Sequence, residues 1–415
     1  MKRTFSFVPS RSAGVVLAGT ALVAATYGLV RLAYGLFLPG VQADLGLTTA
    51  AAGLTSAGAS VVFCLGALTG FALAGRHPRP LVVASATSAA VGAAGMALAP
   101  SAAVFSTFSV LASAGAGLAS PALVTVVRRG ARAEAQHRAQ AVVNSGTGPG
   151  LVVAGLLALV LLPDWRAAWL GVAVATLVVG GLVLVLDRTP TDASGRAPDP
   201  GLPPRSWFAD HRRLVPAAGL LGASSAAAWN YGRAHLVAAG TDETLSVVAW
   251  VVLGLGGTAV VATARVLDDA GPRTGWTVTV LAVGGGTALL GLLPHQPVAA
   301  LVACALFGWG YTAATGVLIV WTSHLDPDRA AAGTSMLFVV LALGQALGAA
   351  ALGLVADLAS HEVGFVAAAA LAVLAVPVAV LGRPCGEDGQ ASGRWYTSGT
   401  PSASSSRASR SLIER

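Results

Sequence analysis

Residues 26–35 read TYGLVRLAYG and form the core of a long apolar segment that covers about residues 13–38. As a helix, such a segment is long enough to cross the ~30 Å hydrocarbon layer of a membrane. Tyr27, Arg31 and Tyr34 are spaced by four and three residues, so they share one face of the predicted helix. A guanidinium keeps its charge in lipid, which costs at least ~2.5 kcal/mol at the helix centre, and we therefore predict that this face lines a wet cavity.

Arg31 has an alternative role near the membrane surface. It lies about two turns before Pro39, where the helix is expected to end, and a long side chain can extend to the interface from there. Asp44 in the following loop would then be its partner. We favour the cavity because two tyrosines flank the arginine on the same face.

The composition is that of an integral membrane protein. The 415 residues are 55% hydrophobic and only 10% charged, against about 25% charged in soluble domains, and the mean hydropathy is +0.74. The net charge of +7 comes from loops between apolar segments, so it reflects membrane topology rather than binding of nucleic acid. Cys64, Cys304 and Cys385 are too scattered for a metal site or a disulfide framework, and we predict no metal and no cofactor.

About twelve apolar segments recur along the chain, separated by short loops. We predict membrane-spanning helices near 13–38, 50–74, 81–99, 102–127, 139–162, 166–186, 214–238, 246–264, 274–293, 298–321, 331–355 and 363–382. The first segment is too long for a signal peptide. The predicted organisation is a cytoplasmic N-terminus (1–12), a six-helix bundle (13–187), a central cytoplasmic loop (188–212), a second six-helix bundle (213–383) and a disordered cytoplasmic tail (384–415).

Basic residues gather in alternate loops. They occupy the loops around residues 2–11, 76–79, 128–138, 188–213, 265–273, 329 and 383 onward. The opposite loops hold Arg166 as their one basic residue, beside acidic residues such as Asp44 and Asp357. Because positive charge is retained on the cytoplasmic side, this asymmetry places both termini in the cytoplasm and requires an even number of spans.

The two halves of the chain repeat one pattern. Arg31, late in the first span, is followed by an acidic loop at Asp44, and Arg233, late in the seventh span, is followed by Asp242 and Glu243. Two six-span repeats are typical of secondary transporters, which bind their substrate between the repeats near the middle of the membrane. The predicted fold is therefore an all-α membrane protein of two pseudo-symmetric six-helix bundles.

The turn after the second span carries a partial family signature. Gly70, Arg76 and Arg79 fit the frame G-x-L-a-D-R-x-G-R-R, but Ala74 stands in place of the Asp and His77 in place of the second Gly. The turn after the eighth span holds a closer copy, made of Asp268, Gly271 and Arg273. In these motifs the chain resembles a permease of the major facilitator superfamily, from about residue 13 to residue 383.

The resemblance implies a conformational latch at Arg76, Arg79, Asp268, Gly271 and Arg273. In the family, the acidic residue and the basic residues after it form a charge relay between helices that holds the outward-open state. The absence of the carboxylate at position 74 weakens the first copy. Positive-inside topology alone is an alternative explanation of its basic pair.

Gly148 and Pro149 in the fifth span match part of a second signature, found in the family's proton-coupled exporters around G-x-x-x-G-P-x-x-G-G. Proline removes a backbone hydrogen bond, and glycine lets a neighbouring helix approach closely. Simple helix packing would select the same residues. The pattern is therefore a predicted helix-packing motif that favours export slightly.

In the same family, spans one, four, seven and ten line the central cavity, and polar side chains collect on these spans here. A row of serines at helical spacing follows the fourth span. The predicted substrate-binding residues are Arg31, Tyr27, Tyr34, Ser113, Asn230, Tyr231, Arg233, Trp309, Tyr311 and Thr315. Each hydroxyl taken alone can instead bond to a backbone carbonyl one turn back.

Arg31 and Arg233 occupy matching places and, facing each other, would form a cationic clamp for carboxylate or phosphate oxygens. The arrangement is similar to that of the family's organic-phosphate exchangers. As an alternative, Arg233 extends outward to Asp242 or Glu243. No carboxylate lies well inside a span, so substrate exchange or uniport fits better than coupling through a buried acid.

We therefore predict a monomeric permease of the bacterial inner membrane that moves a small anionic or amphipathic metabolite by alternating access, with export slightly favoured. Its partners are the substrate, the lipid bilayer and, as a candidate coupling ion, protons, but no nucleic acid. The alternatives are a proton-coupled exporter of hydrophobic drugs and, less favoured, a non-transporting membrane sensor. We expect no enzyme, because no catalytic motif or nucleotide-binding loop is present.

Overall fold

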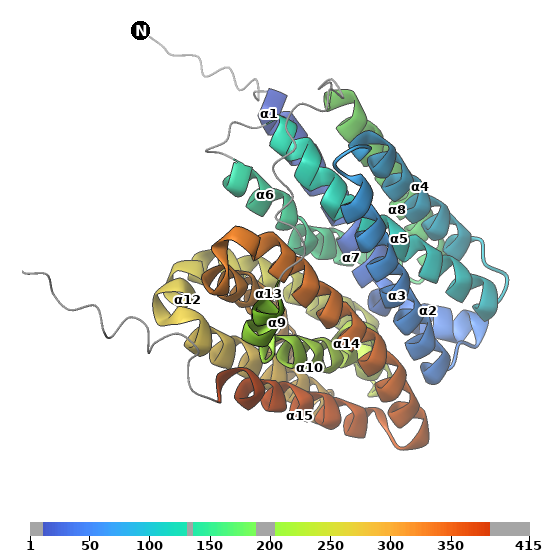
Figure 1. Ribbon diagram of the computed structural model, residues 1–415. Coiled ribbons are helices and arrows are strands. Elements are labelled where there is room, and N and C mark those ends of the chain that lie inside the picture. Colours follow the sequence, from blue (N-terminus) through green and yellow to red (C-terminus); the bar gives the residue numbers. More distant parts are fainter. Residues whose placement is uncertain (1–10, 131–135, 188–203, 382–415) are drawn as a thin grey trace, which may run out of the picture. The chain divides into compact units, whose positions relative to one another are not determined.

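Figure 1 shows the computed structural model of the chain, which describes residues 11–130, 136–187 and 204–381. These residues are helical with short connections, and no strand occurs among them. The described residues up to Val380 form one compact unit. Residues 1–10, the segment 188–203 of the predicted central loop and the predicted disordered tail lie outside the described residues.

The first half of the compact unit, residues 13–187, contains six predicted spans. Its elements are α1 (Arg11–Val23), the π-helix η1 (Ala24–Leu32), α2 (Tyr34–Leu45), α3 (Thr49–Leu73), α4 (Pro78–Ala97), α5 (Ala102–Gly130), α6 (Gln136–Asn144), α7 (Thr147–Leu161) and α8 (Trp165–Leu186). The first span is the run of α1, η1 and α2, and it is longer than predicted because the helix continues past Pro39 to Leu45.

The second half, residues 213–380, follows a short helix that packs against it. The short helix is α9 (Arg205–His211), and the elements of the second half are α10 (Leu214–Ala226), the π-helix η3 (Ala227–Tyr231), α11 (Gly232–Ala238), α12 (Glu243–Leu292), α13 (Pro297–Leu325), the 3-10 turn η4 (Pro327–Arg329), α14 (Ala330–Leu358) and α15 (His361–Val380). The short helix α9 is held by the buried His211, whose ring nitrogen lies 2.7 Å from the Thr322 hydroxyl of α13.

Ten stretches of the described chain are long and apolar enough to cross a membrane. One of them, the 50-residue α12, is a hairpin of two helices, because Gly271 has φ 77° and ψ 164° at the turn. The predicted seventh span is present as α10, η3 and α11, each of which is shorter than a full crossing. The described helices are therefore consistent with about twelve spans.

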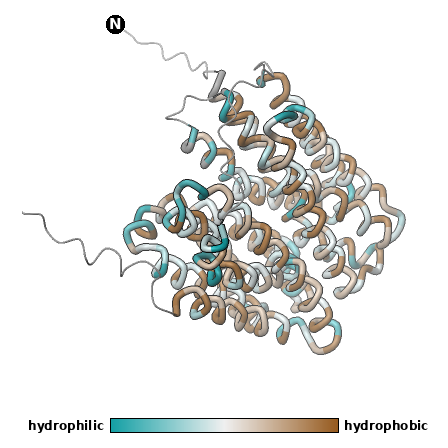
Figure 2. The backbone as a smooth tube through the Cα atoms, in the orientation of Figure 1, coloured by the Kyte–Doolittle hydropathy of each residue, from teal (hydrophilic) through white to brown (hydrophobic). Residues whose placement is uncertain are grey.

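Large apolar side chains face outward along the helices. Figure 2 shows apolar residues along the length of most helices and hydrophilic residues gathered at turns. Phe71, Val160, Val261 and Leu347 are each more than two-thirds exposed, on four different helices. So large an exposed apolar surface would be an aggregation hazard in water, and a lipid environment removes that cost.

Both halves contain a π-helix at the same place, η1 in the first span and η3 in the seventh. In η1 the Ala33 N–H bonds to the Gly28 carbonyl, five residues back, which adds one residue to the turn. Such insertions are frequent at functional sites because they redirect side chains along a helix. Arg31 lies inside η1, and Arg233 follows η3 by two residues.

Glycines allow the two halves to meet backbone to backbone. A Cβ atom on Gly35 of α2 would overlap the carbonyl oxygen of Trp229, and one on Gly53 of α3 would overlap that of Ala349 in α14. Figure 1 shows α3 and α14 side by side. Close packing through small residues is the usual basis of helix association in membranes.

Candidate functional site

A polar pocket lies between the two halves, with about 480 Å³ of empty space, part of it open to solvent. Its lining comes from η1, α2, α3, α5, η3 and α14. The lining residues are Val30, Arg31, Leu32, Tyr34, Ser56, Ala59, Ser60, Ser109, Ser113, Trp229, Asn230 and Gln345. Of the predicted substrate-binding residues, the structure therefore brings four, Arg31, Tyr34, Ser113 and Asn230, to one pocket.

Arg31 supplies the charge of this pocket. Its Nη2 atom donates hydrogen bonds to the Ser60 hydroxyl and to the Gln345 carboxamide oxygen, both at 3.3 Å. The guanidinium carbon lies 4.0 Å from the centre of the Phe63 ring. Among the described residues, no carboxylate lies within ion-pair distance of Arg31. The cation is thus balanced only by neutral dipoles and a ring face.

Gln345 connects Arg31 to the second half. Its side chain is 7% exposed, and its Nε2 atom donates to the Tyr311 hydroxyl at 2.9 Å and to the Ser225 hydroxyl at 3.3 Å. Gln345 is not among the residues predicted from the sequence, because a single amide in an apolar span belongs to no motif. The one signal in the sequence was that Gln345 stands alone in an apolar span, because a buried amide needs hydrogen-bond partners from elsewhere in the fold.

The remaining polar groups of the pocket are uncharged. Ser56 donates to the Asn230 carboxamide oxygen at 2.7 Å, and the Asn230 amide donates to the Ala226 carbonyl at 2.8 Å. The indole N–H of Trp229 is buried and has no partner, while its ring packs edge-on against Phe307 and Tyr311. The pocket therefore offers hydroxyls and an amide beside the cation.

The predicted tyrosines have different surroundings. Tyr34 lines the pocket and donates to the Ala52 carbonyl at 3.1 Å, whereas Tyr27 packs edge-on against Phe63 beneath Arg31. The Tyr231 hydroxyl donates to the Ala349 carbonyl of α14 at 2.6 Å, a bond within the second half. Only Tyr34 of the three has ring surface on the pocket.

On the tenth span, α13, only one of the three predicted residues reaches the site. Tyr311 contacts it through Gln345. Trp309 instead donates to the Thr263 hydroxyl of α12 at 2.9 Å, and Thr315 donates to the Thr312 carbonyl three residues back. The structure thus places Trp309 and Thr315 away from the central pocket.

Arg233 does not face Arg31. Its side chain is 1% exposed, and it borders a separate pocket. It forms an ion pair with Glu243 at 3.1 Å and donates to the Leu36 carbonyl of the first half at 2.7 Å. The cationic clamp expected from the sequence is therefore not formed in this structure, because Glu243, in the first turn of α12, neutralises one of its two members.

The predicted latch residues of the first copy lie at one end of the helices. Arg79 forms an ion pair with Asp187 at 3.8 Å and donates to the Leu184 carbonyl at 3.1 Å, while Arg76 is exposed. The carboxylate near this motif thus comes from the end of α8, in place of the residue missing at Ala74.

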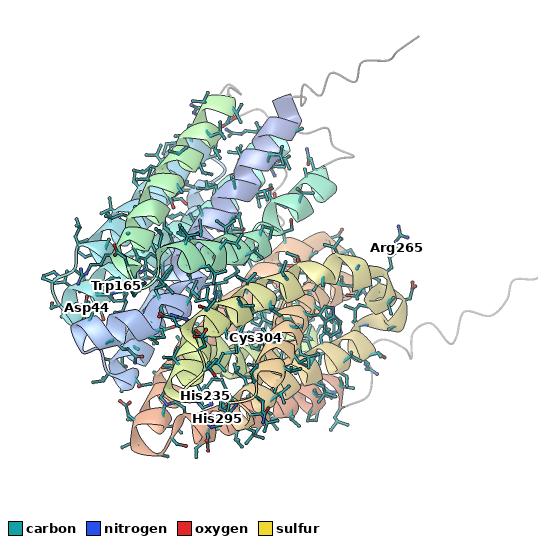
Figure 3. All side chains as sticks on the ribbon, turned by 180° about the vertical axis from the view of Figure 1, so that it is seen from behind. Asp44, Trp165, His235, Arg265, His295 and Cys304 are labelled. Carbon is teal, nitrogen blue, oxygen red and sulfur yellow. The ribbon has the colours of Figure 1, made fainter. Side chains whose placement is uncertain are left out.

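The second copy of the motif contains the turn of α12. Gly271 supplies its positive φ, and Asp268 and Arg273 are exposed, with no ion pair of either among the described residues. Figure 3 shows the nearby Arg265 pointing away from the helices, whereas Cys304 lies among them. This turn carries no closed charge relay in the present conformation.

The predicted helix-packing residues lie at the start of α7. Pro149 is in the first turn of that helix, where a missing N–H costs no hydrogen bond inside the helix. A Cβ atom on Gly148 would come within 2.9 Å of the Thr258 side chain on α12. The pair therefore lies where α7 meets the second half.

A polar pocket between two halves of a helical membrane bundle is typical of secondary transporters. The sequence model of the Major Facilitator Superfamily matches residues 20–349, and the chain belongs to this superfamily. It is thus a transporter and not an enzyme. No curated protein sequence matches the chain significantly.

Solved transporter structures share the fold at low sequence identity. The nucleoside transporter NupG is 13% identical, with a TM-score of 0.73 over 89% of this chain and 98% of that chain. A D-xylose-proton symporter is 13% identical, with a TM-score of 0.74 over 88% and 97%. A POT family transporter in complex with 5-aminolevulinic acid is 12% identical, with a TM-score of 0.73 over 91% and 97%.

Proposed function

We propose that this transporter moves a small anionic or amphipathic metabolite across the plasma membrane by alternating access. The observation that carries the proposal is the guanidinium of Arg31, which borders the central pocket without a carboxylate partner among the described residues. A half-buried cation with only neutral partners is costly, and it cannot shed its proton. A bound carboxylate would supply the missing charge and two hydrogen-bond acceptors.

The charge of the described lining supports one anionic group per substrate. Arg31 is its only charged residue, so the site carries a single positive charge. The serines and Asn230 would bind hydroxyl or carbonyl groups on the rest of the molecule, and Trp229 and Leu32 would contact its apolar part. These features fit an amphipathic monoanion better than a sugar or a hydrophobic cation.

Alternating access requires the two halves to separate at one end and then at the other. The Arg233–Leu36 bond and a 2.9 Å hydrogen bond from the Ala50 N–H to Asp357 join the halves at the end with few basic loops. We infer that this end is external and closed here, with both termini cytoplasmic, because the opposite loops hold most of the arginines.

The proposal also covers how transport is coupled to an ion and in which direction the substrate moves. The described pocket lining contains no carboxylate and no histidine, which favours exchange or uniport over proton coupling at the site. Gly148 and Pro149 resemble part of the exporter signature, which slightly favours export as the direction of transport. We propose that a single chain is the working unit, because the pocket is complete within it.

A drug exporter is the second candidate. The ring of Trp229 packs with Phe307, Tyr311 and Trp250 into one aromatic cluster that reaches the pocket. Such a wall suits flat hydrophobic compounds. Under this alternative Arg31 would be structural, and ligand binding would not depend on an anionic group.

Thermal unfolding of the purified protein in detergent separates these candidates. We would titrate carboxylates, phosphate, sugars and hydrophobic cations, since a ligand at a hundred times its Kd adds ~2.7 kcal/mol of stability. We expect stabilisation by carboxylates that Arg31→Gln abolishes and that Arg166→Gln, a control remote from the pocket, retains. If no anion stabilises the wild type, or Arg31→Gln responds as the wild type does, the anion proposal is wrong.

A further inference from the structure

Gln345 presents an oxygen to the one cation of the pocket. The carboxamide oxygen accepts from Arg31 Nη2 at 3.3 Å, which is longer than the 2.7–2.9 Å typical of a guanidinium–carboxylate bond. Because a guanidinium has only donors, the oxygen rather than the nitrogen of the amide must face it. The position beside Arg31 is thus occupied by a weak, neutral acceptor with the geometry of a carboxylate oxygen.

The other end of the amide is fixed in the second half. Its Nε2 atom donates to Tyr311 and Ser225, so the group bridges α14, α13 and α10 to the first half through Arg31. Gln345 is also 7% exposed, on the edge of the pocket. The amide is therefore held in place from behind and can lose its contact with Arg31 without losing its other partners.

We propose that Gln345 is a placeholder in a carboxylate subsite, and that the substrate is a monocarboxylate whose carboxylate displaces the amide oxygen from Arg31. The inference rests on the proposed function, and it names the substrate class and the residue that senses it. A charged oxygen binds a guanidinium more strongly than a neutral one does. A dianion would leave an excess negative charge in the pocket, so one carboxylate is the best match.

Displacement of Gln345 also connects binding to movement. The Arg31–Gln345 bond joins the two halves inside the pocket, apart from the contacts of Arg233 and Asp357 at the end of the helices. A carboxylate on Arg31 breaks this bond and replaces it with a contact to the substrate. The empty and loaded carriers therefore differ in a link between the halves.

Gln345→Glu tests the placeholder, because it keeps the shape and adds the charge. The probes are benzoate and lactate as monocarboxylates, succinate and phosphate as dianions, and benzamide as the uncharged match of benzoate. We expect a monocarboxylate to stabilise the wild type and Gln345→Glu to lose at least tenfold in apparent affinity for it, as Arg31→Gln does. Gln345→Met, of similar size and without an oxygen, should bind at least as tightly as the wild type.

Each contrary result has a defined meaning. A wild-type response in Gln345→Glu, or a loss of binding in Gln345→Met, overturns the placeholder while the proposed function stands. Stabilisation by succinate or phosphate but not by monocarboxylates overturns the substrate class. If no anion stabilises the wild type, the proposed function itself fails.

A ligand-free measurement tests the subsite geometry independently of the substrate. At neutral pH, Gln345→Glu should raise the melting temperature of the otherwise wild-type protein, because it supplies Arg31 with a carboxylate. The same change in an Arg31→Gln background should lower it, because it buries a carboxylate without a partner. Equal shifts in the two backgrounds would show that position 345 does not face Arg31 and would overturn the proposal.

Discussion

The link between Arg233 and Leu36 predicts a measurable change in the conformational equilibrium. We would replace Arg233 by Met, which keeps most of the volume and removes the charge. In the structure Arg233 has three hydrogen bonds, of which those to Ser246 and Glu243 stay within the second half. Only the 2.7 Å bond to the Leu36 carbonyl crosses to the first half and must break when this end opens.

The magnitude follows from that single bond. A hydrogen bond from a charged donor contributes ~1.5–3 kcal/mol, and its loss leaves the Leu36 carbonyl without this partner in the closed state. The ion pair to Glu243 adds little to the difference between states, because both partners move together and the Glu243 side chain is 58% exposed. We therefore expect the ratio of closed to open populations at this end to fall ~10- to 100-fold.

Double electron–electron resonance would measure the populations. Spin labels on Ala43→Cys and Ala238→Cys, both exposed sites at this end, would report the separation of the halves in a Cys385→Ser background. We expect Arg233→Met to shift weight to longer distances and Glu243→Gln, the matched control, to change little. The reasoning is refuted if Arg233→Met leaves the distances unchanged, or if Glu243→Gln shifts them as far.

Two further changes test the packing and the charge pair. Gly35→Val should lower transport at least tenfold in a liposome uptake assay, because the new side chain would meet the Trp229 carbonyl and prevent closure. Gly171→Val is the control, because no atom lies close to that position, and it should retain the wild-type rate. Retained transport in Gly35→Val would contradict the close approach. Arg79→Gln should lower the unfolding free energy by ~0–1 kcal/mol, because its partner Asp187 is buried but the arginine is 39% exposed, and Arg76→Gln should change it less. Thermal unfolding would contradict this account if Arg76→Gln lost more unfolding free energy than Arg79→Gln.

The course of the chain through the membrane was predictable from the sequence. Apolar segments of sufficient length must cover their backbone polar groups by forming helices in lipid, so hydropathy alone identifies the spans. The turn inside the long α12 was expected as a loop between the eighth and ninth spans, and in the structure Gly271 adopts the positive φ at this turn. Arg31 was expected to line a cavity because a charged guanidinium is costly inside the membrane, and in the structure it borders the central pocket.

The partners of each polar side chain were decided by the tertiary structure. Helical periodicity placed Tyr27, Arg31 and Tyr34 on one face, but the extra residue in the π-helical turn alters the spacing, and only Arg31 and Tyr34 line the pocket. Gln345 lies 314 residues from Arg31 along the chain, so no local pattern could pair them.

Arg233 shows most clearly which properties follow from the sequence and which from the tertiary structure. Its sequence position matches that of Arg31, and the symmetry of the halves predicted equivalent roles. In the structure, Glu243 and the Leu36 carbonyl take up its charge, whereas Arg31 has neutral partners among the described residues. The sequence by itself determined that two arginines lie in matching spans. Only packing of the two halves decided which one keeps an uncompensated charge, because that depends on atoms brought together from distant parts of the chain.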